Sequence, residues 1–383
     1  MHKLAILYGS DMRYYGGGEK YIIEFVNRLP EFDTTIFSFS GSGTFRMSLK
    51  QVSGMANAKI EYYTAFQIPV LKDKIILTAS GLSTIWKVKD FDAVYCTENS
   101  ILTELIMAAL SRVYGFKYIQ GLHDSNTLRD SPMQPGPIRD FLFGIYGKLR
   151  NLALLSIPNI RVVNYSDGDK LLKMGYKGRL YKITDFINVK AGAEKVRINR
   201  KKFTALFVGR LSINHKGIDL LSQIIEKLLD SNKNIMFRII GSGDDGEETV
   251  RALVKKDPKR IKWLGFVSEK DLIDEYLDAS LLLFTSRFES FGLSLAEGAG
   301  YGLPAIAFNV RGPNAIMADP KQGKLINPFD TDEFAAQALN YYKLWSNDKK
   351  AYLRLKSDIS RIVLRRFGES TILPKLTHML LSK

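Results

Sequence analysis

The order of apolar segments along the chain constrains its fold more than any other feature of the sequence. Short runs rich in Val, Ile, Leu and Phe alternate with longer segments whose apolar residues recur at helical spacing, in two successive series. This alternation predicts an α/β protein with two doubly wound domains. The first series predicts strands at 4–8, 34–39, 93–96, 117–120 and 160–164 and helices at 19–29, 101–114 and 167–174; the second predicts strands at 203–208, 236–240, 261–264, 281–284 and 305–308.

Length and composition agree with two domains. A chain of 383 residues, 45% of them hydrophobic, can bury two separate cores. A polar stretch near 187–201 lies between the two series and is the predicted linker. The first residues lack the pattern of a signal peptide, and no apolar run reaches the roughly 20 residues that span a bilayer. We therefore expect a cytoplasmic protein in which the single cysteine, Cys96, is a buried thiol.

Two carboxylates bracket a glycine-containing turn in the second series. Glu289 and Glu297 stand on either side of Gly292, between a predicted buried strand and the start of a helix. The first turn of a helix presents N–H groups that bind anions, and carboxylates accept hydrogen bonds from hydroxyl groups. The backbone N–H groups of 290–293 beside two acids therefore suit a nucleotide sugar. The alternative is a pair of exposed acids that merely flank a helix.

Two cations follow the first strand of the same series. That strand ends at Gly209, Arg210 follows directly, and Lys216 precedes an amphipathic helix. Ligands of open α/β sheets bind at the carboxyl ends of the strands, where fixed positive charges would stabilise a departing diphosphate. We expect removal of either cation to slow turnover and to leave stability nearly unchanged. The alternative is that both are ordinary surface cations.

These motifs, in this order and spacing, resemble the retaining glycosyltransferases of family 4 across most of the chain. The matching segments are Gly16-Gly17-Gly18-Glu19, Gln120-Gly121-Leu122-His123-Asp124, Gly209-Arg210-Leu211, Lys216-Gly217, Gly241-Ser242-Gly243, Trp263-Leu264-Gly265-Phe266-Val267, Glu289 with seven residues before Glu297, and Gly302-Leu303-Pro304.

The resemblance implies a role for each matching position. Glu297 would hold the ribose hydroxyls, Glu289 the hydroxyls of the transferred sugar, and His123 would orient a sugar hydroxyl or stabilise oxocarbenium charge. Gly16 and Gly17 would let backbone approach the phosphate and the acceptor, although an ordinary strand-to-helix turn also explains them. The implied catalytic residues are His123, Arg210, Lys216 and Glu289, and the implied donor-binding residues are Gly16, Gly17, Gly209, Gly265, Phe266, Ser290, Phe291, Gly292, Leu293 and Glu297.

The same resemblance implies the GT-B architecture, in which two Rossmann-like domains face each other across a cleft. The expected acceptor-side domain covers 1–186, the expected donor domain covers 187–348, and helices at about 349–383 cross back to the first domain. A UDP- or GDP-sugar is the expected substrate, with no cofactor and no metal ion, because no Asp-x-Asp motif is present. Retention is expected through same-face substitution, in which the leaving phosphate helps to deprotonate the acceptor.

The net charge of +15 suggests an anionic partner. The first 190 residues carry 24 Lys and Arg against 17 Asp and Glu, so the excess is spread over both halves. No zinc-finger spacing or RNP-like motif supports nucleic acid. The segments 68–89 and 137–155 instead combine apolar and basic residues, the second with Phe141, Ile145, Leu149 and Leu152 on one side and Arg139, Lys148 and Arg150 nearby. They predict peripheral binding to the inner face of an anionic membrane, against the alternative of ordinary core helices with solvated lysines.

Together these features predict a retaining hexosyltransferase that moves a sugar from a nucleoside diphosphate to a cell-surface glycan, polymer or lipid-linked acceptor. Two segments depart from the family pattern, at Asn188 and at Arg311-Gly312-Pro313-Asn314, which leaves the donor sugar open. A sugar-nucleotide epimerase or phosphorylase of the same fold is one alternative. A catalytically silent binding subunit is the other, and the joint presence of Arg210, Lys216, Glu289 and Glu297 argues against it.

Overall fold

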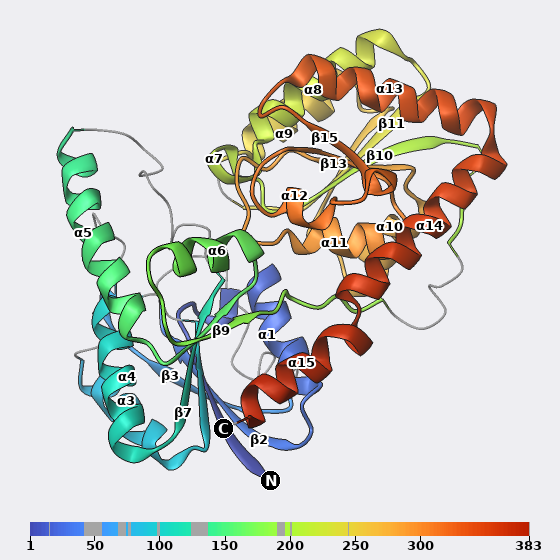
Figure 1. Cartoon of the computed structure of the whole chain (residues 1–383). Coiled ribbons are helices and arrows are strands. Elements are labelled where there is room, and N and C mark those ends of the chain that lie inside the picture. The colour runs from blue at the N-terminus through green and yellow to red at the C-terminus, as the bar shows by residue number, and fades with distance from the viewer. Residues whose placement is uncertain are drawn as a thin grey trace. The chain divides into compact units, whose positions relative to one another are not determined.

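The computed structural model divides the chain into two compact units (Figure 1). The first comprises Met1–Thr184 together with Leu373–Lys383, and the second comprises Asp185–Ile372. The structure describes every residue except 15, 42–55, 68–73, 76–77, 98–99, 124–136, 190–195, 200, 244 and 383.

A seven-stranded sheet of order β3-β2-β1-β6-β7-β8-β9 forms the centre of the first unit, and neighbouring strands run parallel. The strands are β1 (His2–Tyr8), β2 (Phe32–Phe39), β3 (Lys59–Tyr63), β6 (Ala93–Cys96), β7 (Lys117–Leu122), β8 (Asn159–Val162) and β9 (Arg179–Lys182), beside a small antiparallel pair, β4 (Phe66–Gln67) and β5 (Lys74–Ile75). The helices are α1 (Gly17–Asn27), α3 (Ala79–Lys87), α4 (Ile101–Tyr114), α5 (Pro137–Ser156) and α6 (Tyr165–Lys173), with 3-10 turns η1 (Met12–Tyr14) and η2 (Val88–Asp90).

A second parallel sheet, of order β12-β11-β10-β13-β14-β15, forms the centre of the other unit. The strands are β10 (Phe203–Val208), β11 (Ile235–Ile240), β12 (Ile261–Gly265), β13 (Leu281–Phe284), β14 (Ala305–Phe308) and β15 (Gly323–Ile326). The helices are α7 (Ile213–Lys216), α8 (Ile218–Ser231), α9 (Glu247–Lys256), α10 (Glu269–Asp278), α11 (Leu293–Gly300), α12 (Pro313–Ile316), α13 (Thr331–Asn347) and α14 (Lys349–Phe367), with the 3-10 turn η3 (Pro320–Gln322). A last helix, α15 (Glu369–Leu381), begins in this unit and from Leu373 onward belongs to the first.

The central strands are continuous apolar runs because helices cover both faces of a parallel sheet. Leu4 to Leu7 in β1 are fully buried, and so is Cys96 at the end of β6. Helix α8 buries Ile218, Leu221, Ile224, Ile225 and Leu228, which recur at helical spacing. These patterns explain why the predicted α/β class and the predicted strands are present in the structure.

The strand order reverses once in each sheet. In the first, β2 and β3 lie to one side of β1, and β6 begins the other side; in the second, β11 and β12 lie to one side of β10, and β13 begins the other. Crevices form at such switch points, at the carboxyl ends of the two central strands. The ends of β1 and β6, and of β10 and β13, are therefore the places to examine for ligand-binding side chains.

The unit boundaries differ from the predicted domains. We expected the first domain to end at 186 and all of 349–383 to return to it, whereas only Leu373–Lys383 belongs to the first unit. Helix α14 packs in the second unit, where the buried Tyr352 hydroxyl donates to Ser280 O at 2.6 Å and the Ser360 hydroxyl donates to Gly300 O at 2.6 Å. These contacts against β13 and α11 explain the correction.

Candidate functional site

The switch point of the second unit brings together two loops. One runs from Gly209 through α7 to Gly217, and the other follows β13 from Thr285. Gly217 has a φ of +65°, and a Cβ there would lie 2.3 Å from the carbonyl oxygen of Thr285. The Thr285 hydroxyl donates to Lys216 O at 2.8 Å. A side chain at 217 would therefore push the two loops apart.

Arg287 fastens the same two loops from another side. Its guanidinium donates to both oxygens of Asp219, at 2.7 Å each, and to Ile213 O at 2.6 Å. Its backbone N–H donates to His215 O at 2.9 Å. The Arg287 charge and hydrogen bonds outweigh partial burial and lower the pKa of Asp219. The fork of two parallel hydrogen bonds fixes the loop after β13 relative to the start of α8.

Lys216 and Glu289 form an ion pair at the centre of this site. The ammonium contacts Glu289 Oε1, to which the Ser286 hydroxyl also donates at 2.9 Å, and Glu289 is only 8% exposed. Burial by itself would raise the pKa of Glu289, but the Lys216 charge and the hydrogen bonds from Lys216 and Ser286 hold it below its ordinary value. Glu289 is therefore an anion at neutral pH, with its partner fixed.

His215 joins this pair, although no role was predicted for it from the sequence. Its ring stacks on Phe288 with centroids 4.4 Å apart. Nδ1 lies 3.4 Å from Arg210 Nη2, and Nε2 lies 3.8 Å from Glu289 Oε2. Burial, together with the charges of Lys216 and Arg210, lowers the pKa of His215 to about 4, against the opposing effect of Glu289. The imidazole is thus neutral at pH 7 and sits between the predicted cations and the predicted acid. Its position directly before Lys216 was the available signal.

The start of α11 lies directly beyond Glu289. Gly292, with a φ of +105°, is the N-cap and Leu293 is the first helical residue, so its N–H has no carbonyl partner within the helix. Ser290 is half-buried, whereas the Phe291 ring is buried against Phe367 at a centroid distance of 5.3 Å. Phe291 therefore supplies core packing with its side chain, and only its backbone can serve a ligand.

Glu297 lies on α11, beside Tyr276 of α10. Burial raises the pKa of Tyr276 well above its ordinary value, and the Glu297 carboxylate adds to this through its charge and a hydrogen bond. The Tyr276 hydroxyl also lies 3.3 Å from Ser294 O, and its ring stacks on Tyr301. Glu297 is half-buried. Tyr276 is a second residue that sequence reasoning missed, because it stands far from any matching motif.

The remaining predicted glycines of this unit end adjacent strands. Gly209 N donates to Ile240 O at 3.0 Å, and Gly241 N donates to Gly265 O at 2.8 Å. Gly241 has a φ of +133°, and a Cβ there would lie 1.8 Å from Gly209 O, so no other residue fits. Phe266, which follows Gly265, is 65% exposed. These glycines allow the ends of β10, β11 and β12 to meet closely.

The glycine loop of the first unit follows β1 at its switch point. Gly16 is the N-cap of α1 and Gly17 is its first residue. The Glu19 carboxylate accepts hydrogen bonds from Gly16 N at 3.0 Å and from the Tyr8 hydroxyl at 2.8 Å. The φ of Gly16 is −133°, which other residues adopt equally well. Glu19 thus closes the turn, and a contact of this turn with a ligand stays a prediction.

His123 directly follows β7 in the same unit. The Tyr95 hydroxyl, from the end of β6, lies 2.5 Å from His123 Nε2. The structure therefore brings Arg210, His215, Lys216 and Glu289 together in one unit and places His123 beside Tyr95 in the other.

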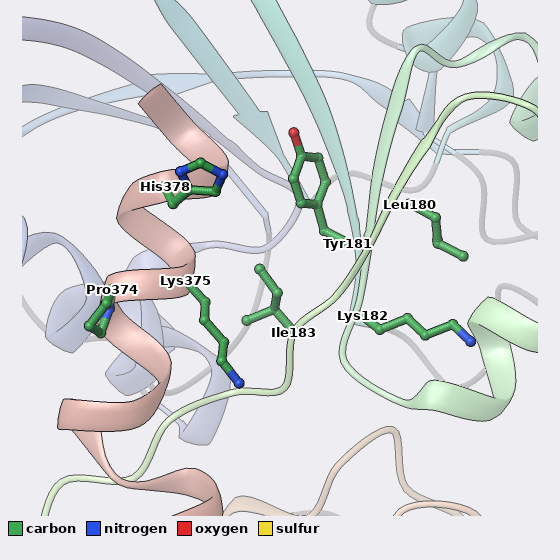
Figure 2. Close-up of a pocket in the computed structure, with 7 residues that line it drawn as sticks. All are labelled: Leu180, Tyr181, Lys182, Ile183, Pro374, Lys375 and His378. Atoms are coloured by element: carbon green, nitrogen blue, oxygen red, sulfur yellow. The ribbon is translucent and has the colours of Figure 1, made fainter. Parts of the chain in front are cut away.

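A surface pocket of the first unit does not involve any of these residues. It measures about 450 Å³ and lies between β9 and α15 (Figure 2). Its lining consists of Leu180, Tyr181, Lys182, Ile183, Pro374, Lys375 and His378. Strand-end geometry and charge, rather than cavity size, identify the candidate site.

The structure describes the two segments predicted to bind a membrane only in part. Ile145, Leu149 and Leu152 of α5 are 47%, 53% and 65% exposed, as the pattern predicts. Arg150, predicted to lie near that apolar side, cannot contact lipid headgroups, since it is 3% exposed and pairs with the fully buried Glu104 at 2.7 Å. Much of 68–77 and the side chains of 137–143 lie outside the described residues.

Neither a metal cluster nor a membrane span is found among the residues described. No three or more His, Cys, Asp or Glu side chains there are grouped so that they could hold a metal ion. None of the described helices is both long and apolar enough to cross a bilayer.

Known proteins resemble this chain in sequence and in fold. Residues 189–356 match the family described as Glycosyl transferases group 1. A 2-deoxystreptamine N-acetyl-D-glucosaminyltransferase of Niallia circulans is 32% identical over 186 residues, which make up 48% of this chain and 46% of that protein. A poly(ribitol-phosphate) alpha-N-acetylglucosaminyltransferase of Staphylococcus aureus is 27% identical over 180 residues, or 46% of this chain and 35% of that protein. The chain thus spans less than half the length of these curated relatives.

The likeness to solved structures extends over both units. The Anabaena protein Alr3699/HepE, in complex with UDP and glucose, aligns over 100% of both chains with a TM-score of 0.71 and 17% identity. Both units therefore have the Rossmann-like α/β fold of GT-B proteins, and residues 189–356 match the family model for glycosyl transferases group 1.

Proposed function

We propose that the protein is a retaining glycosyltransferase that transfers a sugar from a nucleoside diphosphate to a glycan, polymer or lipid-linked acceptor. One observation carries this proposal: Arg210, His215, Lys216 and Glu289 meet where β10 and β13 end, at the switch point of the sheet. Two cations and a buried carboxylate at such a crevice match the charges and hydroxyl groups of a nucleotide sugar.

Lys216 and Arg210 are the proposed ligands of the donor diphosphate. Leaving-group departure places negative charge on the β-phosphate, and fixed cations stabilise that charge without reorganising. His215 stays neutral between them, so it adds no positive charge that would compete for Glu289. The N–H groups at the start of α11 add a further anion-binding element.

The two carboxylates have separate proposed tasks. Glu289, held by Lys216 and Ser286, accepts hydrogen bonds from hydroxyls of the transferred sugar. Glu297, beside Tyr276, accepts from the ribose hydroxyls. Neither is proposed as a nucleophile. Retention then proceeds by substitution on one face of the sugar, with the leaving phosphate taking the acceptor proton.

The relatives support a sugar nucleotide as donor. Two of them are named as N-acetylglucosaminyltransferases, and a protein of the same fold was solved with UDP and glucose. We propose a UDP-sugar as the first donor to test, followed by GDP-sugars.

The test is incubation of the purified protein with a panel of nucleotide sugars and candidate glycan or lipid-linked acceptors. We expect acceptor-dependent release of nucleoside diphosphate and a product whose anomeric configuration, measured by NMR, equals that of the donor. Change of the donor sugar without an acceptor would instead indicate an epimerase, and release dependent on inorganic phosphate a phosphorylase. Tight nucleotide binding without any turnover would indicate a silent subunit.

We also propose that the first unit contacts an anionic membrane. Trp86 of α3 and Tyr114 of α4 are 58% and 44% exposed, with ring centroids 6.2 Å apart. Lys89 Nζ lies 3.6 Å from the Trp86 ring centroid, and Val113 is 74% exposed. Exposed aromatic rings beside a cation are typical of residues that bind at the level of lipid headgroups.

Liposome sedimentation tests this contact. We expect binding to anionic vesicles that weakens as salt rises, because each nearby cation contributes roughly 1 kcal/mol and is screened. Trp86→Ala should reduce binding, whereas Leu172→Ala, which removes a residue that is 51% exposed on α6, should not. Equal binding to neutral and anionic vesicles, or none at low salt, would favour the alternative that 68–89 and 137–155 are ordinary core helices with solvated lysines.

A further inference from the structure

A fully buried arginine stands behind His123 in the first unit. Arg161 of β8 is 0% exposed. Its Nε donates to Ile183 O at 3.0 Å, and its Nη2 donates to Thr184 O at 2.8 Å. Two backbone carbonyls thus fix the guanidinium plane. Burying a cation costs desolvation energy, which hydrogen bonds must offset. The hydrogen bonds therefore determine how the guanidinium group is oriented.

The same guanidinium reaches two tyrosines. Nη1 donates to the Tyr95 hydroxyl at 2.8 Å, and Nη2 lies 3.1 Å from the Tyr21 hydroxyl of α1. Tyr95 is 0% exposed, and its ring packs against Phe25 at 5.8 Å. Of the two tyrosine hydroxyls, that of Tyr95 lies 2.5 Å from His123 Nε2 and so links Arg161 to the histidine.

The chemistry of these groups gives the contacts a direction. A guanidinium can only donate, so the Tyr95 oxygen accepts from Arg161. A phenol has one proton. When its oxygen accepts a hydrogen bond from a cation, the O–H becomes more polarised and is a better donor. His123 Nε2, 2.5 Å away, is the acceptor that this polarised hydroxyl favours. In the neutral ring the proton is then carried by Nδ1, since the bond at one nitrogen fixes the state of the other.

The backbone of β7 leaves room for this arrangement. A Cβ at Gly121 would lie 2.5 Å from the Tyr95 hydroxyl and 3.0 Å from His123 Cδ2. Any other residue at 121 would press into the contact between the two rings.

We propose that Tyr95, held by Arg161, is a positioning residue that fixes His123 in the tautomer protonated at Nδ1. His123 then presents a hydrogen-bond donor, not an acceptor, at its second nitrogen. This inference rests on the proposed function for its purpose, which is to donate to a hydroxyl or ring oxygen of the transferred sugar. The assignment of the tautomer itself concerns the free protein.

Tyr95→Phe tests the proposal, and Tyr21→Phe is the matched control. Both remove one hydroxyl that contacts Arg161 and keep a buried ring, but only Tyr95 hydrogen-bonds to His123. Nitrogen NMR of protein labelled in its histidine rings reads the tautomer directly, with His123→Gln identifying the signal. We expect a protonated Nδ1 and a bare Nε2 in wild type and in Tyr21→Phe, and a shift of the proton toward Nε2 in Tyr95→Phe.

Transfer kinetics give a second readout. Loss of one orienting hydrogen bond should lower the kcat of Tyr95→Phe by roughly 3- to 10-fold, with little change in the KM for the donor. In a His123→Gln background the Tyr95→Phe change should have no further effect, because its action passes through His123. A merely structural role would slow both backgrounds equally.

The outcomes are separable from those of the proposed function. A wild-type His123 that is protonated at Nε2, or a tautomer that is the same in Tyr95→Phe, would overturn the inference whatever the enzyme transfers. Absence of any transferase activity would overturn the proposed function and leave the NMR result standing. If Tyr95→Phe fails to fold, Gly121→Ala, which intrudes on the same contact, replaces it in both measurements.

Discussion

Replacing Lys216 by methionine tests the ion pair at the centre of the second unit. Methionine keeps most of the apolar stem and removes the ammonium group. Glu289, only 8% exposed, would keep the Ser286 hydroxyl at 2.9 Å but lose its cation. From the sequence we expected removal of Lys216 to leave stability nearly unchanged. The buried pair reverses that expectation.

The expected loss of stability follows from the burial of the acid. Removing one partner of a buried pair leaves an uncompensated charge and costs about 3–5 kcal/mol. Because the Ser286 hydrogen bond remains, we expect the free energy of unfolding to fall by about 3 kcal/mol at pH 7. Turnover should fall by about 100-fold or more, since the same ammonium is the proposed ligand of the departing diphosphate.

The loss of stability in Lys216→Met should depend on pH. In wild type the pKa of Glu289 is lower in the folded protein than in the unfolded chain, where it is near 4.5. The ionised carboxylate therefore stabilises the fold fully above pH 4.5, and this stabilisation is lost as the pH falls through the pKa of the folded state. Without Lys216, burial raises the pKa, and the penalty disappears once the acid is protonated. The difference in stability between the two proteins should therefore be largest at neutral pH and should shrink toward pH 4.

Tryptophan fluorescence during urea unfolding measures the effect in the right unit. Two of the three tryptophans, Trp263 and Trp345, lie in the second unit, so a Trp86→Phe background reports that unit alone. Lys256→Met is the control, because Lys256 pairs with Glu226 at an exposed site and should cost less than about 1 kcal/mol. A Lys216→Met protein as stable as the control at pH 7, or a difference that does not change with pH, would refute the reasoning.

Three further predictions concern metal, the carboxylates and a buried lysine. Transfer should survive excess EDTA, and a loss that magnesium or manganese restores would contradict this. Glu297→Gln should weaken binding of nucleoside diphosphate by about 1.5–3 kcal/mol in calorimetry, whereas Glu289→Gln should leave that affinity intact and slow transfer from the whole donor; equal losses in both assays would reject this division of roles. Burial lowers the pKa of Lys356 to about 8, so the unfolded state binds more protons above that pH, and wild type should gain about 3 kcal/mol over Lys356→Met between pH 8 and 10.5; parallel stability curves would argue against a lowered pKa.

The fold could be predicted where buried strands consist of consecutive apolar residues. The buried stretches of the central strands, Leu4–Tyr8 of β1 and all of β13, are apolar because helices cover both of their faces. The strands that the pattern missed, β3, β9 and β15, each lie at an edge of a sheet. Their sequences mix charged and apolar residues, as in Arg-Leu-Tyr-Lys of β9, because an edge strand is partly solvated.

The site could be predicted where spacing along the chain determines proximity. Arg210, Lys216 and Glu289 follow strands that are neighbours in the sheet, and the structure brings them together. The ion pair itself could not be predicted, because 73 residues separate Lys216 from Glu289 and only the folded sheet closes that distance. His215 and Tyr276 were missed for a similar reason: a stacked ring or a raised pKa depends on neighbours that no local motif contains.

Helix α15 has a consequence for how the chain folds during synthesis. Its last residues belong to the first unit, where Leu376 and Met379 are fully buried and Thr377 hydrogen-bonds to Glu31 at 3.1 Å. The second unit is one uninterrupted stretch of chain, so its core needs no residue from elsewhere in the sequence. The first unit, although it emerges earlier, must wait with part of its core open until the segment after Ile372 has been made. The unit that is translated first thus depends on the segment of the given chain that is translated last.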